Sequence, residues 1–172
     1  MYGPNSFIPV VRDARELENQ NPVYAAFSGN VIGQAFKRDD VRNAALAAYM
    51  GLIKQIDDQM GVLFDYLRDN SQLENTVIAV TSDHGDYMGD HWLGEKDLFH
   101  EPSVEVPLII YDPSPMADAT RGTVCDALVE SIDLVPTFVE MAGGTPRNEH
   151  LEGLSLVPFL HGGAPERWRD FV

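Results

Sequence analysis

A strand-like run that leads directly into acidic and imidazole side chains is the part of this sequence best suited to chemistry. Residues Thr76–Val80 are β-branched or small, which predicts a strand buried on both faces. Asp83 and His84 follow it, and Gly85 permits the sharp turn that would let these two neighbours share one ion. A carboxylate with an imidazole suits Zn²⁺, Mn²⁺ or Fe²⁺. We therefore expect a metal site at the carboxyl end of this strand.

The loop after this strand is dense in groups that bind metals or anions. Lys96 is its only lysine, and a fixed ammonium could stabilise negative charge on a phosphoryl or sulfuryl group. Acidic loops are often only a solvated surface, so the loop by itself leaves both interpretations open. The candidate ligands are Asp83, His84, Asp86, Asp90, His91, Glu95, Asp97, His100 and Glu101.

The flanking segments predict α/β elements that would position this loop. Apolar residues recur at intervals of three and four from Asp40 to about Asn70, which predicts a long amphipathic helix that feeds the strand. Residues 1–40 are interrupted by proline and glycine, so we expect an irregular segment with short helical pieces leading into an α/β part over residues 41–172. The other expected elements are a buried strand over Val104–Tyr111, a helix over Ser131–Ala142, a loop and short helix over Leu151–Leu160 and the start of a strand at Trp168–Val172, with Thr123–Val129 open between strand and helix.

The composition describes an acidic globular protein. Its 172 residues are 44% hydrophobic, and 27 acidic against 12 basic residues give a net charge of -15. Such a surface argues against nucleic acid or anionic membrane as partner, and no apolar run reaches the ~20 residues of a membrane helix. The start of the sequence shows no secretory signal, and the single cysteine, Cys125, fits a cytoplasmic protein. Beside Asp126, we expect Cys125 to be buried and structural rather than a nucleophile.

Several segments, in order along the chain, resemble one family. The run Thr81–Lys96, TSDHGDYMGDHWLGEK, followed by Pro102–Ile110, closely resembles the sulfatase family of the alkaline phosphatase superfamily, nearest to its phosphonate monoester hydrolases. The resemblance extends from about residue 41 to the end. The other similar segments are Tyr49–Gly61, Ser131–Thr137 ending at Ala142–Gly143, and Glu152–Leu160.

This resemblance implies a fold and a set of site residues. The fold would be α/β, an alkaline-phosphatase-like mixed sheet flanked by helices, incomplete in this chain. Asp83 and His84 would bind one divalent metal ion, Mn, Zn or Ca, and Lys96, 13 positions after Asp83, would contact a non-bridging oxygen or the leaving group. Arylsulfatases usually carry Asn where His84 stands, which favours phosphonate and phosphate esters. His91 and His100 are not matched to a role in the family; His100 is a further candidate for a substrate contact, and His91 for ordering the loop.

The resemblance also implies parts that this sequence lacks. Family members are two to three times as long, and their N-terminal half carries an Asp pair for the metal and a Cys-x-Pro-Ser-Arg motif. That cysteine becomes formylglycine, whose hydrate is the nucleophile, whereas Cys125 precedes Asp-Ala-Leu and does not match. We therefore expect a C-terminal part of a hydrolase of small anionic esters, inactive alone, with a homo-oligomer left open. The alternative is a non-catalytic acidic domain that binds a metal or a protein partner.

Overall fold

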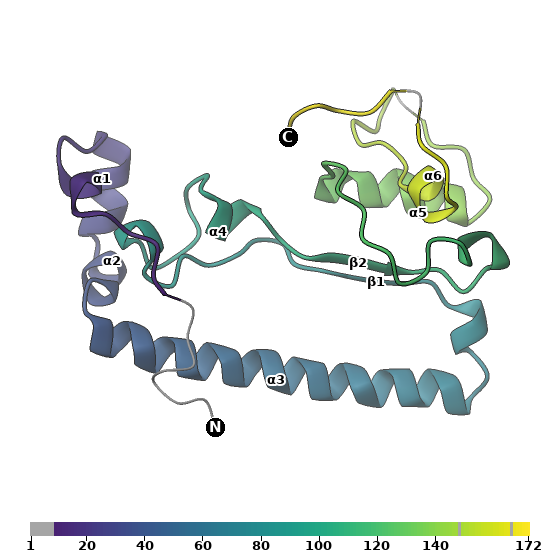
Figure 1. The fold of residues 1–172 in the computed structure, drawn as a ribbon, viewed down its shortest axis with the longest axis horizontal. Helices are drawn as coiled ribbons and strands as arrows, with labels where there is room; N and C mark the ends of the chain where they lie inside the picture. The colour runs from purple at the N-terminus through teal and green to yellow at the C-terminus, as the bar shows by residue number, and fades with distance from the viewer. Residues whose placement is uncertain (1–8, 148, 166) are drawn as a thin grey trace. The chain divides into compact units, whose positions relative to one another are not determined.

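The computed structural model describes residues 9–147, 149–165 and 167–172, in which helices accompany a two-stranded sheet (Figure 1). The opening residues, on which the expectation about a secretory signal rests, lie outside this range. The α-helices are α1 (Pro22–Gly29), α2 (Val31–Phe36), α3 (Asp39–Asp69), α4 (Glu101–Val104), α5 (Leu134–Met141) and α6 (Val157–Leu160); the strands are β1 (Ile78–Thr81) and β2 (Leu108–Tyr111); and short 3₁₀ turns span Ala14–Leu17, Leu73–Asn75, Asp90–Trp92, Pro115–Ala117 and Ser131–Asp133.

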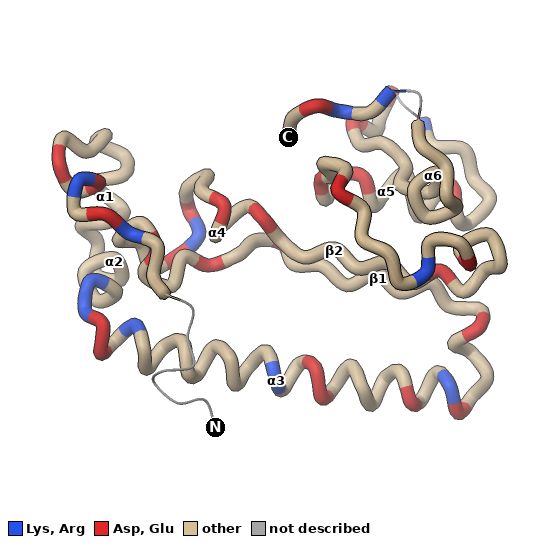
Figure 2. The backbone as a smooth tube through the Cα atoms, viewed as in Figure 1, with Lys and Arg blue, Asp and Glu red and all other residues tan. Residues whose placement is uncertain are grey.

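The chain divides into two compact units. The first comprises residues 1–69 and 80–108, and the second comprises residues 70–79 and 109–172. The loop with the candidate site residues therefore lies within the first unit. Asp and Glu are distributed along both units rather than gathered in one segment (Figure 2).

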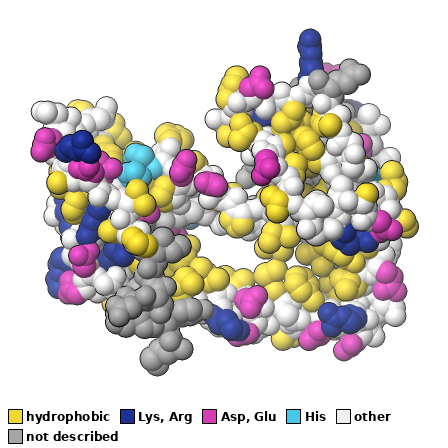
Figure 3. Space-filling model, viewed as in Figure 1, with side chains coloured by type: hydrophobic (Ala, Val, Ile, Leu, Met, Phe, Trp, Pro, Cys, Tyr) yellow, Lys and Arg dark blue, Asp and Glu magenta, His cyan; other side chains and the backbone are white. Residues whose placement is uncertain are grey.

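Helix α3 confirms the long amphipathic helix that the sequence predicts. It begins with Asp39 and Asp40 in its first turn and has Arg68 in its last, which complements the helix dipole at both ends. Hydrophobic side chains are visible on its surface (Figure 3). The large apolar residues of α3 that remain exposed are Leu52, Ile53, Ile56, Val62, Leu63 and Tyr66.

Helices α1 and α2 precede α3 and pack in sequence, α1 against α2 and α2 against α3. The side chain of Asn21 caps α1 by accepting from the Val23 amide at 2.9 Å, and Asn30 caps α2 through the Gly33 amide at 2.7 Å. A Cβ at Gly33 would lie 2.5 Å from the Phe27 carbonyl oxygen, so the tight turn between the two helices requires glycine. The segment expected to be irregular thus contains short, capped helices.

The two strands pair with each other in an antiparallel sheet (Figure 1). The prediction that both are buried on two faces is wrong for the described residues, where they are half-buried or exposed and Ile109 is 63% exposed. Each strand has one described neighbour, so little covers its side chains. The second strand also begins later than predicted, since Pro102 in the first turn of α4 starts a helical turn that includes Val104.

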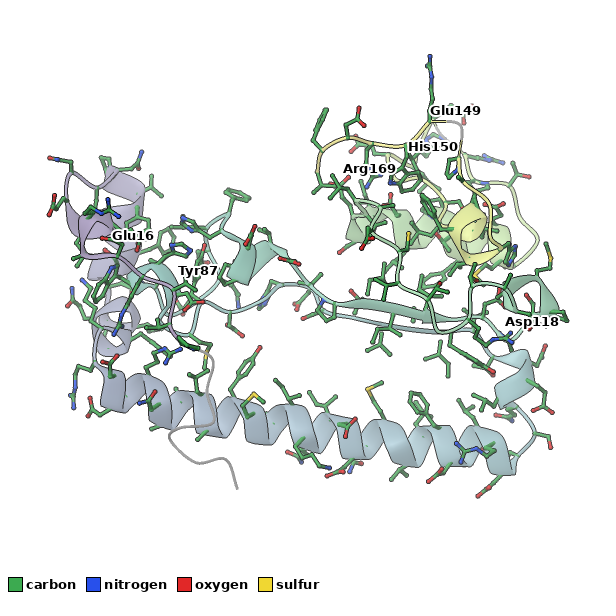
Figure 4. All side chains as sticks on the ribbon, in the orientation of Figure 1. Glu16, Tyr87, Asp118, Glu149, His150 and Arg169 are labelled. Carbon is green, nitrogen blue, oxygen red and sulfur yellow. The ribbon has the colours of Figure 1, made fainter. Side chains whose placement is uncertain are left out.

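The second unit is built around a fully buried carboxylate. The Asp133 side chain accepts from the Glu130 and Leu154 amides, both at 2.8 Å, and from the Arg169 guanidinium at 2.7 and 2.8 Å (Figure 4 labels Arg169). Gly153 permits this packing, because a Cβ there would lie 2.1 Å from the Ile132 carbonyl oxygen. Helix α5 confirms the helix predicted over Ser131–Ala142, and α6 confirms the short helix predicted within Leu151–Leu160.

Three expectations for the second unit need correction. Thr123–Val129 is neither strand nor helix, and Cys125 is exposed rather than buried because it lies in this irregular segment. Trp168–Val172 is not a strand, since no described strand pairs with it; instead the Trp168 indole donates to the Leu128 carbonyl at 2.7 Å.

No helix among the described residues is both long and apolar enough to cross a bilayer.

Candidate functional site

Asp83 and His84 face each other just after β1. The side chain of Asp83 is 85% exposed and that of His84 is 36% exposed. His84 Nδ1 lies 2.9 Å from the Gly85 carbonyl oxygen, and because a carbonyl can only accept, Nδ1 carries the proton. In the neutral ring the lone pair is then on Nε2, which lies 3.5 Å from Asp83 Oδ2. This orientation leaves a carboxylate oxygen and an imidazole nitrogen free side by side.

The pair has the separation of two ligands on one metal ion. Ligands ~2.0–2.1 Å from a tetrahedral ion lie ~3.3 Å apart, close to the distance between Nε2 and Oδ2. The backbone carbonyl that fixes the tautomer of His84 is the kind of partner that orients metal-binding imidazoles. Within the described ranges, no cluster of three or more His, Cys, Asp or Glu could hold a metal. Asp83 and His84 thus fit part of a metal site.

Two other carboxylates of the loop already have protein partners. Asp86 accepts a hydrogen bond from Tyr49 of α3, and the pKa of Tyr49 is raised by burial and then by the charge of Asp86. Asp90 Oδ1 accepts from the Val11 amide at 2.9 Å. Both contacts connect the loop to other parts of the first unit. Asp86 and Asp90 therefore have a structural role that the exposed Asp83 side chain does not have.

His91 and His100 form a stacked pair in the first unit. Their ring centroids are 4.3 Å apart at an interplanar angle of 17°. His91 Nδ1 lies 2.9 Å from Glu16 Oε1, and Tyr24 donates to the His91 carbonyl. Tyr87, which is 2% exposed, places its hydroxyl 2.8 Å from His100 Nδ1 (Figure 4 labels Glu16 and Tyr87). The pair therefore links the N-terminal segment to the loop.

The protons of this network follow from its geometry. The Tyr87 hydroxyl accepts from the His100 amide at 3.1 Å, so its own proton is available for His100 Nδ1. Burial, and then His91, lower the pKa of His100, which favours this neutral ring. Burial raises the pKa of Tyr87, and burial, followed by Glu16 and Tyr87, raises the pKa of Tyr24 to about 12. Both phenols therefore remain protonated donors near neutral pH.

The middle of the loop has an unusual backbone. Met88, His91 and Trp92 have φ of 47°, 50° and 61°, and Gly89 has φ of 102°. Left-handed conformations of non-glycine residues are strained and persist only where neighbours enforce them. At Met88 this neighbour is Arg42, because its Nε donates to the Met88 carbonyl at 3.1 Å and its side chain packs against Gly89.

Lys96 has an exposed side chain and an anchored backbone. Its carbonyl accepts from the hydroxyl of Ser103 in α4. It lines a small pocket together with Phe27 and Asn30 of the α1–α2 region and with Leu93. The ammonium is therefore accessible to an anionic group.

The sequence-predicted residues occupy distinct environments. Asp83 and His84 are brought together, Lys96 lies on the same loop in the same unit, and His100 is held by Tyr87 and His91. Their roles in binding metal or substrate stay predictions. Sequence reasoning missed Ser103 and Glu16, and only Ser103 lies in a segment that carried a signal, the family-like run after Lys96.

Comparisons with known proteins agree on one family. The family model described as Sulfatase matches residues 12–144. A multifunctional alkaline phosphatase superfamily protein, PehA, from Trinickia caryophylli is 44% identical over 124 residues, which cover 72% of this chain and 23% of that protein. An arylsulfatase from Clostridium perfringens is 35% identical over 156 residues, which cover 90% of this chain and 31% of the arylsulfatase.

Solved structures give the same picture. The phosphonate monoester hydrolase SpPMH from Silicibacter pomeroyi matches 98% of this chain and 34% of its own chain, with a TM-score of 0.85 and 30% identity. The phosphonate monoester hydrolase of Agrobacterium radiobacter matches 98% of this chain and 35% of its own, with a TM-score of 0.82 and 29% identity. The chain spans about a quarter to a third of the length of these relatives.

Proposed function

Because this chain belongs to the sulfatase family and has an incomplete alkaline-phosphatase-like α/β fold, we propose that it is the C-terminal part of a metal-dependent ester hydrolase. Its substrates would be small anionic sulfate, phosphonate or phosphate esters. The nucleophile, of the formylglycine type, would lie outside this chain. The observation that carries the proposal is the 3.5 Å approach of His84 Nε2 to Asp83 Oδ2, a separation that would suit two ligands of one metal ion.

Asp83 and His84 would hold the metal in this proposal. A bound divalent ion would supply a Lewis acid that withdraws charge from an ester oxygen. The carboxylate of Asp83 would also offset part of the charge of the ion, and the Gly85 carbonyl would keep the imidazole of His84 oriented. Two ligands are fewer than the three that a catalytic metal site normally needs, so the remaining ligands would come from outside this chain.

Lys96 would bind the charged end of the substrate. A transferring phosphoryl or sulfuryl group spreads negative charge over its oxygens, and an ammonium placed beside them stabilises the transition state more than the ground state. The exposed side chain and anchored backbone of Lys96 support this role.

The identity of residue 84 supports a narrower substrate class. Arylsulfatases usually carry Asn at the position of His84, and the two structural neighbours described above are phosphonate monoester hydrolases. We therefore favour phosphonate and phosphate esters over aryl sulfates. The chain by itself would not turn over any of these substrates, because the nucleophile is absent from it.

The test is kinetic and uses the complete enzyme with aryl phosphonate, phosphodiester and sulfate substrates. Lys96→Ala should lower kcat/KM by about 10²-fold, or about 3 kcal/mol, while the metal content stays unchanged. Lys54→Ala is the matched control, because Lys54 is a half-exposed lysine on α3 in an ion pair with Asp58. Its kinetics should remain normal.

The following outcomes would contradict the assignment. Near-normal rates in Lys96→Ala, or loss of its metal, would make Lys96 a surface or structural residue. Turnover by the isolated chain that Asp83→Ala abolishes would show that the nucleophile is not needed from outside. A complete protein that binds metal but has no hydrolase activity would favour the non-catalytic alternative.

A further inference from the structure

Ser103 contacts both halves of the candidate site through its own atoms. It lies in α4 and is 3% exposed. Its backbone carbonyl accepts from the Gly85 amide at 2.8 Å, and Gly85 directly follows His84. Its hydroxyl donates to the Lys96 carbonyl. One buried residue therefore bridges the segment that carries the metal ligands and the segment that carries the lysine.

This bridge matters because the side chains of the site have little packing of their own. Asp83 is mostly exposed and Lys96 is exposed, so side-chain contacts do not fix their separation. Their relative positions depend on where the backbone holds each Cα. Productive geometry in a charge-stabilising site is sensitive to displacements of about 1 Å, so a backbone anchor has a kinetic consequence.

The backbone of Ser103 is itself fixed by a hydrogen bond to His100, which is in turn bonded to Tyr87. Its amide donates to the His100 carbonyl at 2.9 Å, and the His100 amide donates to the buried Tyr87 hydroxyl at 3.1 Å. Pro102 packs so closely on Gly85 that a Cβ at Gly85 would lie 2.0 Å from the Pro102 carbonyl oxygen. The α4 turn therefore has little room to shift against the end of β1.

We propose that Ser103 is a positioning residue that sets Lys96 relative to Asp83 and His84. Its carbonyl fixes the turn after His84, and its hydroxyl fixes the backbone of Lys96. In this role Ser103 acts through the two segments that it binds, and not by contact with metal or substrate. The catalytic consequence of this role rests on the proposed function, whereas the clamp itself is a property of the chain.

The first experiment measures the clamp in the chain alone. Amide hydrogen exchange at Gly85 should become about tenfold faster in Ser103→Ala. The Gly85 amide still bonds to the Ser103 carbonyl, but the α4 turn that carries this carbonyl has lost the hydroxyl bond to Lys96, and loss of one hydrogen bond makes opening of a local unit about tenfold easier. Ser28→Ala is the matched control: Ser28 is 2% exposed in the same unit, and its hydroxyl bonds to Gln20 at 3.4 Å, away from the loop. Exchange at Gly85 should be unchanged in this control.

The second experiment measures kinetics in the complete enzyme. Ser103→Ala should lower kcat about tenfold, with KM within about twofold and metal content unchanged, since the ligands stay and only the lysine loses its anchor. Ser103→Thr keeps the hydroxyl and should recover most of kcat. Ser103→Cys keeps nearly the same shape with a weaker donor, and replaces Ser103→Ala in both experiments if that variant does not fold.

The possible failures are distinguishable. If the wild-type enzyme is active and Ser103→Ala matches Ser28→Ala in kcat and in Gly85 exchange, the positioning role is overturned while the proposed function stands. Loss of metal in parallel with loss of rate would also overturn it, because the effect would then be on the ligands. If the Asp83→Ala enzyme is as fast as wild type, the proposed function fails. The exchange measurement still decides whether the clamp exists.

Discussion

Replacement of Gly85 by alanine would strain the contact between the end of β1 and α4. The added Cβ would lie 2.0 Å from the Pro102 carbonyl oxygen and 3.0 Å from its carbonyl carbon. These are backbone atoms, so the α4 turn must move by about 1 Å or more to restore an ordinary contact. That movement would break the 2.8 Å bond from Gly85 to Ser103, a loss of about 0.5–1.5 kcal/mol, and overpacking adds about 1–3 kcal/mol. We expect Gly85→Ala to lower the free energy of unfolding by about 2–4 kcal/mol.

Urea unfolding of the chain, followed by circular dichroism, measures this loss. Gly61→Ala is the matched control, since nothing lies within 4 Å of a Cβ at this position in α3. Alanine there should stabilise the helix by up to about 1 kcal/mol. A Gly85→Ala chain whose unfolding free energy lies within about 0.5 kcal/mol of wild type would refute the close contact between β1 and α4.

Two further predictions concern titration and the second unit. Because burial, then His91, lower the pKa of His100 from 6.5, its contribution to stability is present above about pH 6.5 and is lost as the pH falls through the lowered value. Thermal unfolding should therefore show a smaller drop in Tm between about pH 7 and pH 5 for His100→Gln than for wild type. Equal drops in the two proteins would count against a lowered pKa of His100 in the folded chain. Asp133→Ala should destabilise the chain by about 3–5 kcal/mol in urea unfolding, because the Glu130 and Leu154 amides lose their acceptor and the largely buried Arg169 guanidinium keeps only its ion pair with Glu130. Asp118→Ala removes one partner of an exposed pair and should change stability by less than about 1 kcal/mol. Similar effects of these two substitutions would contradict the buried network.

Regular elements with local signals were predictable from the sequence. The three- and four-residue spacing of apolar side chains gives α3 within a residue or two at each end. The strands were predicted as too long and too buried, because an apolar run indicates strand propensity but does not reveal how many neighbours cover the strand. Pro102 could have signalled that a helical turn, and not a strand, contains Val104.

The candidate site was predictable only in part. Asp83, His84 and Lys96 could be chosen because they are close in sequence and follow a strand. The partners that order the loop come from far away: Glu16 is 75 positions from His91, and Val11 is 79 from Asp90. Such pairings depend on tertiary contacts that leave no periodic pattern, and the hydroxyl of Ser103 gives no sign in the sequence of which carbonyl it will contact.

Calorimetric titration of Mn²⁺ and of Zn²⁺ into the isolated chain and into the complete protein tests whether Asp83 and His84 form part of a metal site that segments outside this chain complete. Asp83 and His84 supply two ligands, so the chain should bind weakly, and Asp83→Ala should remove this binding. The complete protein, with the further ligands, should bind much more tightly. Equal affinities in the two proteins would contradict the account, because the loop would then carry a full metal site of its own.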